Sequence, residues 1–142
     1  MTRIEFFFNV ANKLQKVADL SESAVNKGRR LMVFTADTAA TLNLENQLWT
    51  HPPIGFLPHC RADSALASVT PIIIDWQGAQ LPHDDVLINL QSQHPPFFSR
   101  FRRLIEIVGE DEADKAEARV RYRFYRDRGY EIKSFDVTGA AL

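Results

Sequence analysis

The chain has 142 residues, the length of a single domain that buries about 70% of the surface its unfolded form exposes. Its composition, 45% hydrophobic and 25% charged, is that of a globular protein and excludes a disordered or fibrous chain. The formal net charge of −1 argues against a protein whose whole surface grips nucleic acid phosphates. We therefore expect one packed domain over residues 1–142, in which residues 138–142 form a short tail.

Cysteine usage and apolar runs predict the location of the protein. Cys60 is the single cysteine and cannot form an internal disulfide, and the apolar run at 3–8 is too short for a signal peptide. No apolar run approaches the ~20 residues that a membrane span requires. The sequence therefore predicts a protein of the reducing cytoplasm with no membrane anchor.

The N-terminal part alternates strand-like and helix-like patterns. The apolar run that ends at 6–8 predicts a buried strand, and Asn9 is placed to cap the helix that follows. Apolar residues at helical spacing predict a helix to about Lys27, ended by Gly28, where a left-handed conformation is easiest. Residues 31–35 predict a second buried strand.

A second helix completes the repeated strand–helix pattern. Asp37 is expected to cap it, and its apolar positions include Ala40, Leu44 and Leu48. Continuous apolar strands joined by crossover helices are typical of parallel sheets covered on both faces. The sequence thus predicts a single α/β domain with a mostly parallel central sheet flanked by helices.

The rest of the chain is expected to add strands and one last helix. Short strands are predicted at 71–76, 86–90, 104–108 and around 132–137. Residues 60–70 have no clear period and are expected to form a loop. The last helix is expected to begin after the acidic turn at 109–111 and to stop before Gly129, because an acidic start and a basic end both suit the helix dipole.

Motifs for phosphate binding do not occur in this sequence. A phosphate at a helix N-terminus needs glycines where the backbone closes on the anion. The six glycines are scattered, neither G-x-G-x-x-G nor G-x-x-x-x-G-K-[ST] occurs, and residues 9–11 after the first strand contain no glycine. The sequence therefore argues against nucleotide binding and predicts no cofactor.

Two small polar groups are candidate sites of chemistry. His59 lies beside Cys60, but sequence neighbours rarely present a base in line to a nucleophile, so Cys60 is interpreted as an ordinary loop cysteine. His83 and the two aspartates after it could ligate a cation, but no second ligand pair at zinc-site spacing accompanies them. We expect no catalytic residue and no metal site, and keep an enzyme acting through the 59–60 loop only as a third alternative.

Charge changes sign at the start of the last helix. Residues 106–114 contain five acidic side chains and no basic one, whereas residues 115–128 contain six basic side chains against two acidic ones. Helical spacing predicts that one narrow face carries Lys115, Arg119, Tyr122 and Arg126. Such a face can hold an acidic peptide through arginine–carboxylate pairs and an aromatic contact. It can equally be a solvated basic face with Tyr122 packed on a neighbour.

The segment 48–59 (LWTHPPIGFLPH) is more apolar than ordinary loops. It carries Trp49, Phe56 and three prolines. Such a segment either packs beneath the sheet or contacts a partner, and core packing is the default for a tryptophan.

Together these segments resemble the chi subunit family of bacterial DNA polymerase III. The resemblance rests on the basic pair after Gly28, the 48–59 pattern, the strands at 71–76 and 86–90, and the last helix. It implies a nucleotide-binding-like (Rossmann-like) fold without a phosphate-binding loop. It also implies a non-catalytic accessory role at the clamp loader during DNA replication.

The resemblance implies two protein partners. One is the psi subunit, and the other is single-stranded DNA-binding protein, whose acidic C-terminal tail ends in phenylalanine. The implied tail-binding residues are Lys115, Arg119 and Tyr122, with Arg126 beside them. The implied psi-binding residues are Trp49, Pro52, Phe56 and Pro58. DNA would then be contacted mainly indirectly.

Direct binding of single-stranded nucleic acid by the same helix is the alternative. Its arginines would meet phosphates, and Tyr122, Phe124 or Tyr125 would stack on bases. The acidic cluster just before the helix counts against this alternative.

Overall fold

The computed structural model describes residues 2–49, 59–62, 64–66, 70–78, 81 and 83–137, without the side chain of Trp49. The helices and strands in chain order are β1 (Arg3–Val10), α1 (Lys13–Asn26), β2 (Leu31–Phe34), α2 (Thr38–Trp49), β3 (His59–Arg61), β4 (Ile72–Asp75), β5 (Val86–Asn89), the 3₁₀ turn η2 (Phe98–Arg100), β6 (Arg103–Gly109), α3 (Glu112–Asp127) and β7 (Ile132–Asp136).

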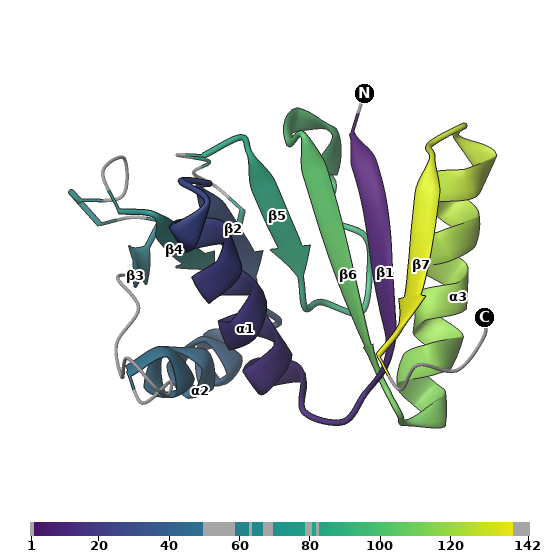
Figure 1. Ribbon diagram of the computed structural model, residues 1–142. Coiled ribbons are helices and arrows are strands. Elements are labelled where there is room, and N and C mark those ends of the chain that lie inside the picture. The colour runs from purple at the N-terminus through teal and green to yellow at the C-terminus, as the bar shows by residue number, and fades with distance from the viewer. Residues whose placement is uncertain are drawn as a thin grey trace.

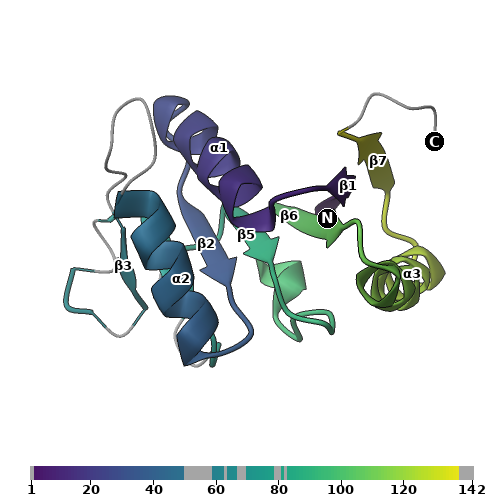
Figure 2. The same ribbon diagram turned by 90° about the horizontal axis from the view of Figure 1, so that it is seen from below.

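The strands of the described chain form one seven-stranded sheet in the order β3-β4-β2-β5-β6-β1-β7. Every neighbouring pair is parallel. Helices α1 and α2 cover one face of the sheet, and α3 packs on the other face behind β1 and β7 (Figures 1 and 2). The expected α/β architecture with a parallel central sheet is confirmed.

Each face of the sheet has its own hydrophobic core. On the side of α1 and α2, residues such as Val17, Leu44 and Ile74 are buried together. On the side of α3, Phe6 and Tyr125 belong to the second cluster. Because side chains alternate between the faces of a strand, strands in the middle of a sheet covered on both faces are apolar at nearly every position. This is why the buried strands read as continuous apolar runs.

The chain leaves the sheet on opposite faces after two adjacent strands. After β1 it enters α1 on one face, and after β6 it enters α3 on the other. The carboxyl ends of β1 and β6 therefore form the topological switch point, where proteins of this architecture usually bind ligands.

Several predicted helix ends are confirmed in atomic detail. The backbone N–H of Ala40 donates to the Asp37 carboxylate at 2.8 Å, as expected for the cap of α2. Helix α1 ends at Asn26 and is followed by Gly28 at φ 72°, and α3 is followed by Gly129 at φ 83°. Both glycines adopt the left-handed conformation that ends helices.

The predicted cap of the first helix was wrong. Asn9 does not cap α1, because β1 continues to Val10 and the cap is Asn12, whose side chain accepts from the N–H of Gln15 at 3.1 Å. Asn9 instead adopts φ 60° and donates from Nδ2 to Asp136 at 2.9 Å, which ties β1 to β7.

The expected loop at 60–70 begins inside a strand. Residues His59–Arg61 pair in parallel with β4 as the edge strand β3. A strand of three residues is too short to show a period, and it forms through pairing with β4 and not through its own sequence pattern.

Candidate functional site

The candidate site is built on α3, whose ends are fixed by local chemistry. The Asp111 carboxylate accepts from the N–H of Asp114 at 3.3 Å and caps the helix. Glu112 and Asp114 lie in the first turn and Arg126 in the last, so the charges complement the helix dipole. The helix therefore begins and ends where the sequence predicted.

A buried polar cluster holds α3 against the sheet. The carboxylate of Glu106 on β6 is fully buried, and three side chains donate to it. Arg121 donates from Nε at 3.0 Å, Tyr125 from its hydroxyl at 2.6 Å, and Asn89 from Nδ2 at 3.1 Å to each carboxylate oxygen. Arg121 also donates to the carbonyl of Ser92 at 2.8 Å. These bonds fix both the position and the rotation of α3.

Burial shifts the pKa values of Glu106 and Tyr125 in this cluster. Burial raises the pKa of Glu106, and the charge of Arg121 with the hydrogen bonds from Tyr125 and Asn89 offsets part of that effect. Burial and the neighbouring carboxylate also raise the pKa of Tyr125. The tyrosine therefore stays a hydrogen-bond donor to Glu106 at neutral pH.

The sequence reasoning missed this cluster. Arg121 is one of the six basic residues counted in 115–128, and its side chain is buried beside Glu106. One signal was present: Glu106 interrupts the apolar run 104–108, and a carboxylate in a strand covered on both faces needs a buried partner. Which residue supplies that partner depends on how α3 packs against the sheet.

The predicted basic–aromatic residues do lie along one face of α3. Lys115, Arg119, Tyr122 and Arg126 all fall within the continuous helix at successive turns. Arg119 and Arg126 are exposed. Lys115 keeps 29% of its side chain accessible and lies 3.8 Å from Glu112. Arg126 approaches Asp127 at 3.4 Å.

Tyr122 is partly buried against the sheet. Its ring contacts Phe6 of β1, with centroids 5.4 Å apart and planes tilted by 55°. Phe6 is stacked in turn on Phe8 at 5.6 Å. Tyr122 and Phe8 both remain partly exposed beside the buried Phe6. Tyr122 therefore belongs to an aromatic group between α3 and β1 and is not a freely rotating surface ring.

The opposite flank of α3 is arranged differently. Phe124 is stacked on His94 at 3.6 Å with planes 16° apart, and the guanidinium of Arg128 lies 3.6 Å from the centre of its ring. Burial and the nearby Arg128 charge lower the pKa of His94. Tyr125, with no exposed surface, cannot stack on bases, which corrects one residue of the nucleic-acid alternative for this helix.

The residues predicted to bind psi lie at the limit of what the structure describes. Trp49 is the last residue of α2, and its side chain is not described. Pro52, Phe56 and Pro58 lie outside the described residues. This surface stays a prediction.

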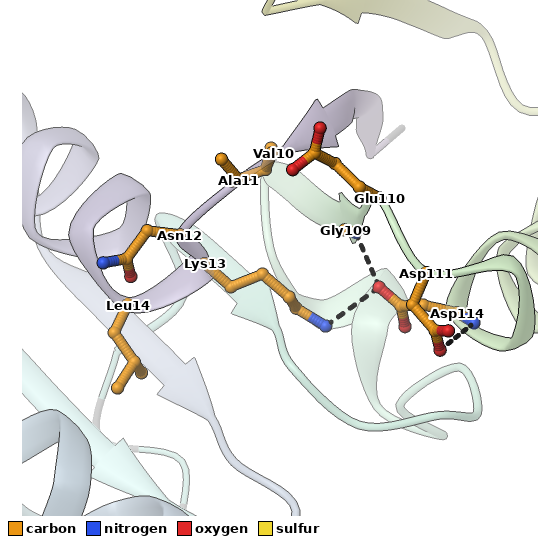
Figure 3. A pocket seen from close by; sticks show the side chains of 9 residues that line it. All are labelled: Val10, Ala11, Asn12, Lys13, Leu14, Gly109, Glu110, Asp111 and Asp114. Atoms are coloured by element: carbon orange, nitrogen blue, oxygen red, sulfur yellow. Dashed lines mark hydrogen bonds and ion pairs between the residues drawn. The ribbon is translucent and has the colours of Figure 1, made fainter.

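A cleft of about 590 Å³ occupies the topological switch point (Figure 3). There the Asp114 carboxylate accepts from the backbone N–H of Gly109 at 2.6 Å and from Lys13 Nζ at 3.2 Å. Glu110 and Asp111 add two further carboxylates to the walls. A phosphate at this position would meet donors already engaged and three negative charges, so the electrostatics of the cleft oppose nucleotide binding.

The described residues contain no group of three or more His, Cys, Asp or Glu side chains that could hold a metal ion. Among the same residues, no helix combines the length and apolar character needed to cross a membrane.

The fold and the site define a parallel, Rossmann-like α/β domain whose switch-point cleft is lined by Glu110, Asp111 and Asp114 and whose last helix presents a basic–aromatic face. The family described as "DNA polymerase III chi subunit, HolC" matches residues 1–133. DNA polymerase III subunit chi of Haemophilus influenzae is 33% identical over 120 residues, covering 84% of this chain and 83% of the relative. The Pseudomonas aeruginosa subunit is 31% identical over 137 residues, covering 94% and 95%. The chain belongs to the DNA polymerase III chi subunit family.

A solved structure supports the fold independently. The C-terminal domain of the DEAD-box protein Dbp5 superposes with a TM-score of 0.62 over 96% of this chain and 92% of that domain. The two sequences are 12% identical, so this likeness concerns the fold alone.

Proposed function

We propose that this chain is a non-catalytic accessory subunit of the DNA polymerase III clamp loader. In this proposal it bridges the psi subunit and the acidic C-terminal tail of single-stranded DNA-binding protein during replication. The observation that carries the tail-binding part is the face of α3 on which exposed Arg119 lies one turn from Tyr122. A subunit that works beside a bacterial chromosome is expected in the cytoplasm.

The chemistry of the α3 face fits an acidic peptide that ends in an aromatic residue. Arg119 can hold a carboxylate through two parallel hydrogen bonds. Tyr122 and Phe8, each partly exposed beside Phe6, offer an apolar contact for a phenylalanine ring. Lys115 and Arg126 extend the positive charge by about a turn in either direction.

The rigidity of this face favours binding. The side chains of Arg121 and Tyr125 are locked to Glu106, so the helix is held in one orientation before any partner arrives. A preformed face loses less conformational entropy on binding than a flexible one. Exposed ion pairs still contribute little each, so we expect affinity of about micromolar strength, near −8 kcal/mol. Many tails on one coated strand would raise the effective concentration.

The second attachment follows from the family resemblance. Trp49, Pro52, Phe56 and Pro58 are proposed to face psi. The backbone of Trp49 ends α2, which lies at the end of the sheet opposite to α3 (Figure 1). Partners at the two ends of one rigid sheet could bind at the same time, as a bridge requires.

Calorimetry with the acidic tail peptide tests the proposal. The peptide with its terminal phenylalanine should bind at micromolar strength, and the peptide without it should bind at least tenfold more weakly, because the aromatic residue supplies the main contact. Equal affinity for the two peptides, or no binding of either, would contradict a tail-binding role.

A further inference from the structure

We propose that the side of the sheet facing α1, where it extends over β1 and β7, binds single-stranded nucleic acid directly. In the described residues α1 contacts β2 and β6, and no helix covers this side of β7 (Figure 2). This surface, the open face, is distinct from the α3 surface proposed for the tail. It gives the protein a contact of its own with the strand.

The open face carries a pair of stacked aromatic rings. Phe7 and Phe135 are register partners on β1 and β7, with ring centroids 5.1 Å apart and planes 22° apart. Phe135 is 42% exposed, as is the nearby Val137. Lys16 Nζ lies 4.7 Å from the centre of the Phe7 ring. Exposed rings with cations beside them are the usual platform for bases of single-stranded nucleic acid.

A basic pocket opens on the same side of the sheet. It encloses about 340 Å³ between the C-terminal half of α1 and the strands. Its cationic lining residues are Arg3, Lys27, Arg29 and Arg103. Arg103 is held by Glu5 through bonds of 2.6 and 2.7 Å, and Arg29 lies 3.9 Å from Asp85. Within the described part of the chain, Arg3 and Lys27 form no ion pair.

The basic pocket and the aromatic pair are aligned along β1. Side chains alternate on a strand, so Arg3, Glu5 and Phe7 share one face, and a rise of ~3.3 Å per residue puts Phe7 about 13 Å from Arg3. Lys133, the exposed register partner of Glu5 on β7, lies between them. A single strand would therefore meet alternating charge and ring contacts along one line.

Five carboxylates lie near this line, and most of them are engaged by other groups. Glu5 pairs with Arg103, Asp85 lies near Arg29, and Glu131 is exposed just before β7. Asp19 and Glu22 line a pocket with Lys27 on α1, where Asp19 accepts from Gln15 at 3.0 Å. The carboxyl end of α1 also faces the pocket, but its carbonyls are partly satisfied, since Arg29 N–H donates to Ala24 at 2.8 Å. The remaining charge is positive, which suits phosphates.

Single strands fit this surface better than duplex DNA or an acidic peptide. Only unpaired bases can lay a ring face on Phe135, because bases in a duplex are stacked on one another. An acidic peptide would use the cations without needing flat ring faces. The proposal also gives a role to Arg29, the first residue of the basic pair at 29–30, because Arg29 lines the pocket.

The test is fluorescence anisotropy of a labelled oligothymidylate with the full chain, titrated at several salt concentrations. The wild-type chain should bind, with affinity falling as salt rises. Phe135→Ala should weaken binding at least about fivefold through lost stacking. Lys27→Glu should weaken it and reduce the salt slope by about 0.7 or more. Val120→Ala, at an exposed position on α3, is the matched control and should bind as the wild type does.

Circular dichroism should first establish that each variant is folded, which the exposure of Phe135 favours. Absence of binding by the wild type would overturn the inference. So would binding that Arg119→Glu removes and Phe135→Ala leaves unchanged. Inorganic phosphate competing fully while Phe135→Ala has no effect would reduce the pocket to a simple anion site and also overturn it.

The test separates this inference from the proposed function. If the tail peptide loses affinity on Phe135→Ala while the oligonucleotide does not, the open face is a peptide site and the nucleic-acid assignment is wrong. If the oligonucleotide binds as expected and the wild-type chain ignores the tail peptide, the inference stands and the tail-binding proposal fails.

Discussion

The two flanks of α3 use similar side chains to different ends. On one flank the ring of Tyr122 packs against Phe6 of the core, and Arg119 is exposed. On the other, Phe124 is covered by His94 on one side and by the guanidinium of Arg128 at 3.6 Å. A basic–aromatic composition therefore does not by itself identify a binding face; the flank proposed to bind is the one whose Arg119 guanidinium lies over no ring in the described structure.

The largest loss of stability is expected from removing Glu106, whose hydrogen bonds to Arg121 and Tyr125 hold α3, and so both of its flanks, on the sheet. Glu106→Ala leaves the Arg121 guanidinium buried without its carboxylate, so we expect a loss of about 3–5 kcal/mol in the free energy of unfolding. Urea denaturation measures this loss. Glu106→Gln keeps the shape and part of the hydrogen bonding, and should lose less. A change within error for Glu106→Ala would mean that packing alone holds α3.

Reversing one exposed charge should distinguish the flanks in binding. Arg119→Glu is expected to weaken binding of the tail peptide by about 2 kcal/mol or more, through repulsion and loss of a paired contact. Arg128→Glu makes the same charge change on the other flank and should affect affinity far less. Calorimetry of both variants decides the point, and equal losses would show that only overall charge matters.

Truncating Arg128 should lower the stability of the protein more than truncating Arg119 does. Arg128→Ala loses the cation–π contact with Phe124, which is worth about 0.5–1 kcal/mol at an exposed site. Thermal unfolding at low and high salt measures it. Arg119 forms no such ring contact in the described structure, so Arg119→Ala should unfold near the wild-type temperature. A drop in unfolding temperature as large as that of Arg128→Ala would contradict the distinction between the flanks.

The smallest effect should appear on acidification. The pKa of His94 is lowered in the folded chain, so its neutral form is favoured there and protonation opposes folding. The stabilisation from His94 is fully present above its unfolded pKa of about 6.5 and is lost as the pH falls through its lower folded value. The free energy of unfolding of the wild type, relative to that of His94→Phe, should fall as the pH drops below about 6. A pH-independent difference would contradict this account.

Local signals in the sequence predicted much of the fold. Buried parallel strands such as 31–35 show as apolar runs, and Asp37 and Gly129 mark helix ends through their own side chain or backbone. Helical spacing also placed Arg119 and Tyr122 on one face. These inferences need only neighbours in the chain.

What the sequence did not reveal depends on contacts between distant segments. The Glu106–Arg121 pair forms only once α3 lies on β6, and His59–Arg61 becomes a strand only through β4. The exposure of Arg119 against the burial of Arg121, two residues later, follows from the rotation of the helix on the sheet. Charge and period alone could not give that rotation.

The interior position of β1 has a consequence for synthesis of the chain. Arg3 pairs with Arg103, and Ile4 with Ile132, so β1 is synthesised well before either of its sheet partners, β6 and β7. At about 5–20 residues per second, that delay is of the order of 5–20 s. During this time the apolar strand holding Phe6 has no partner, and long-range parallel pairing is slow to form. The order of synthesis therefore leaves an apolar strand unpaired until most of the described chain has been made.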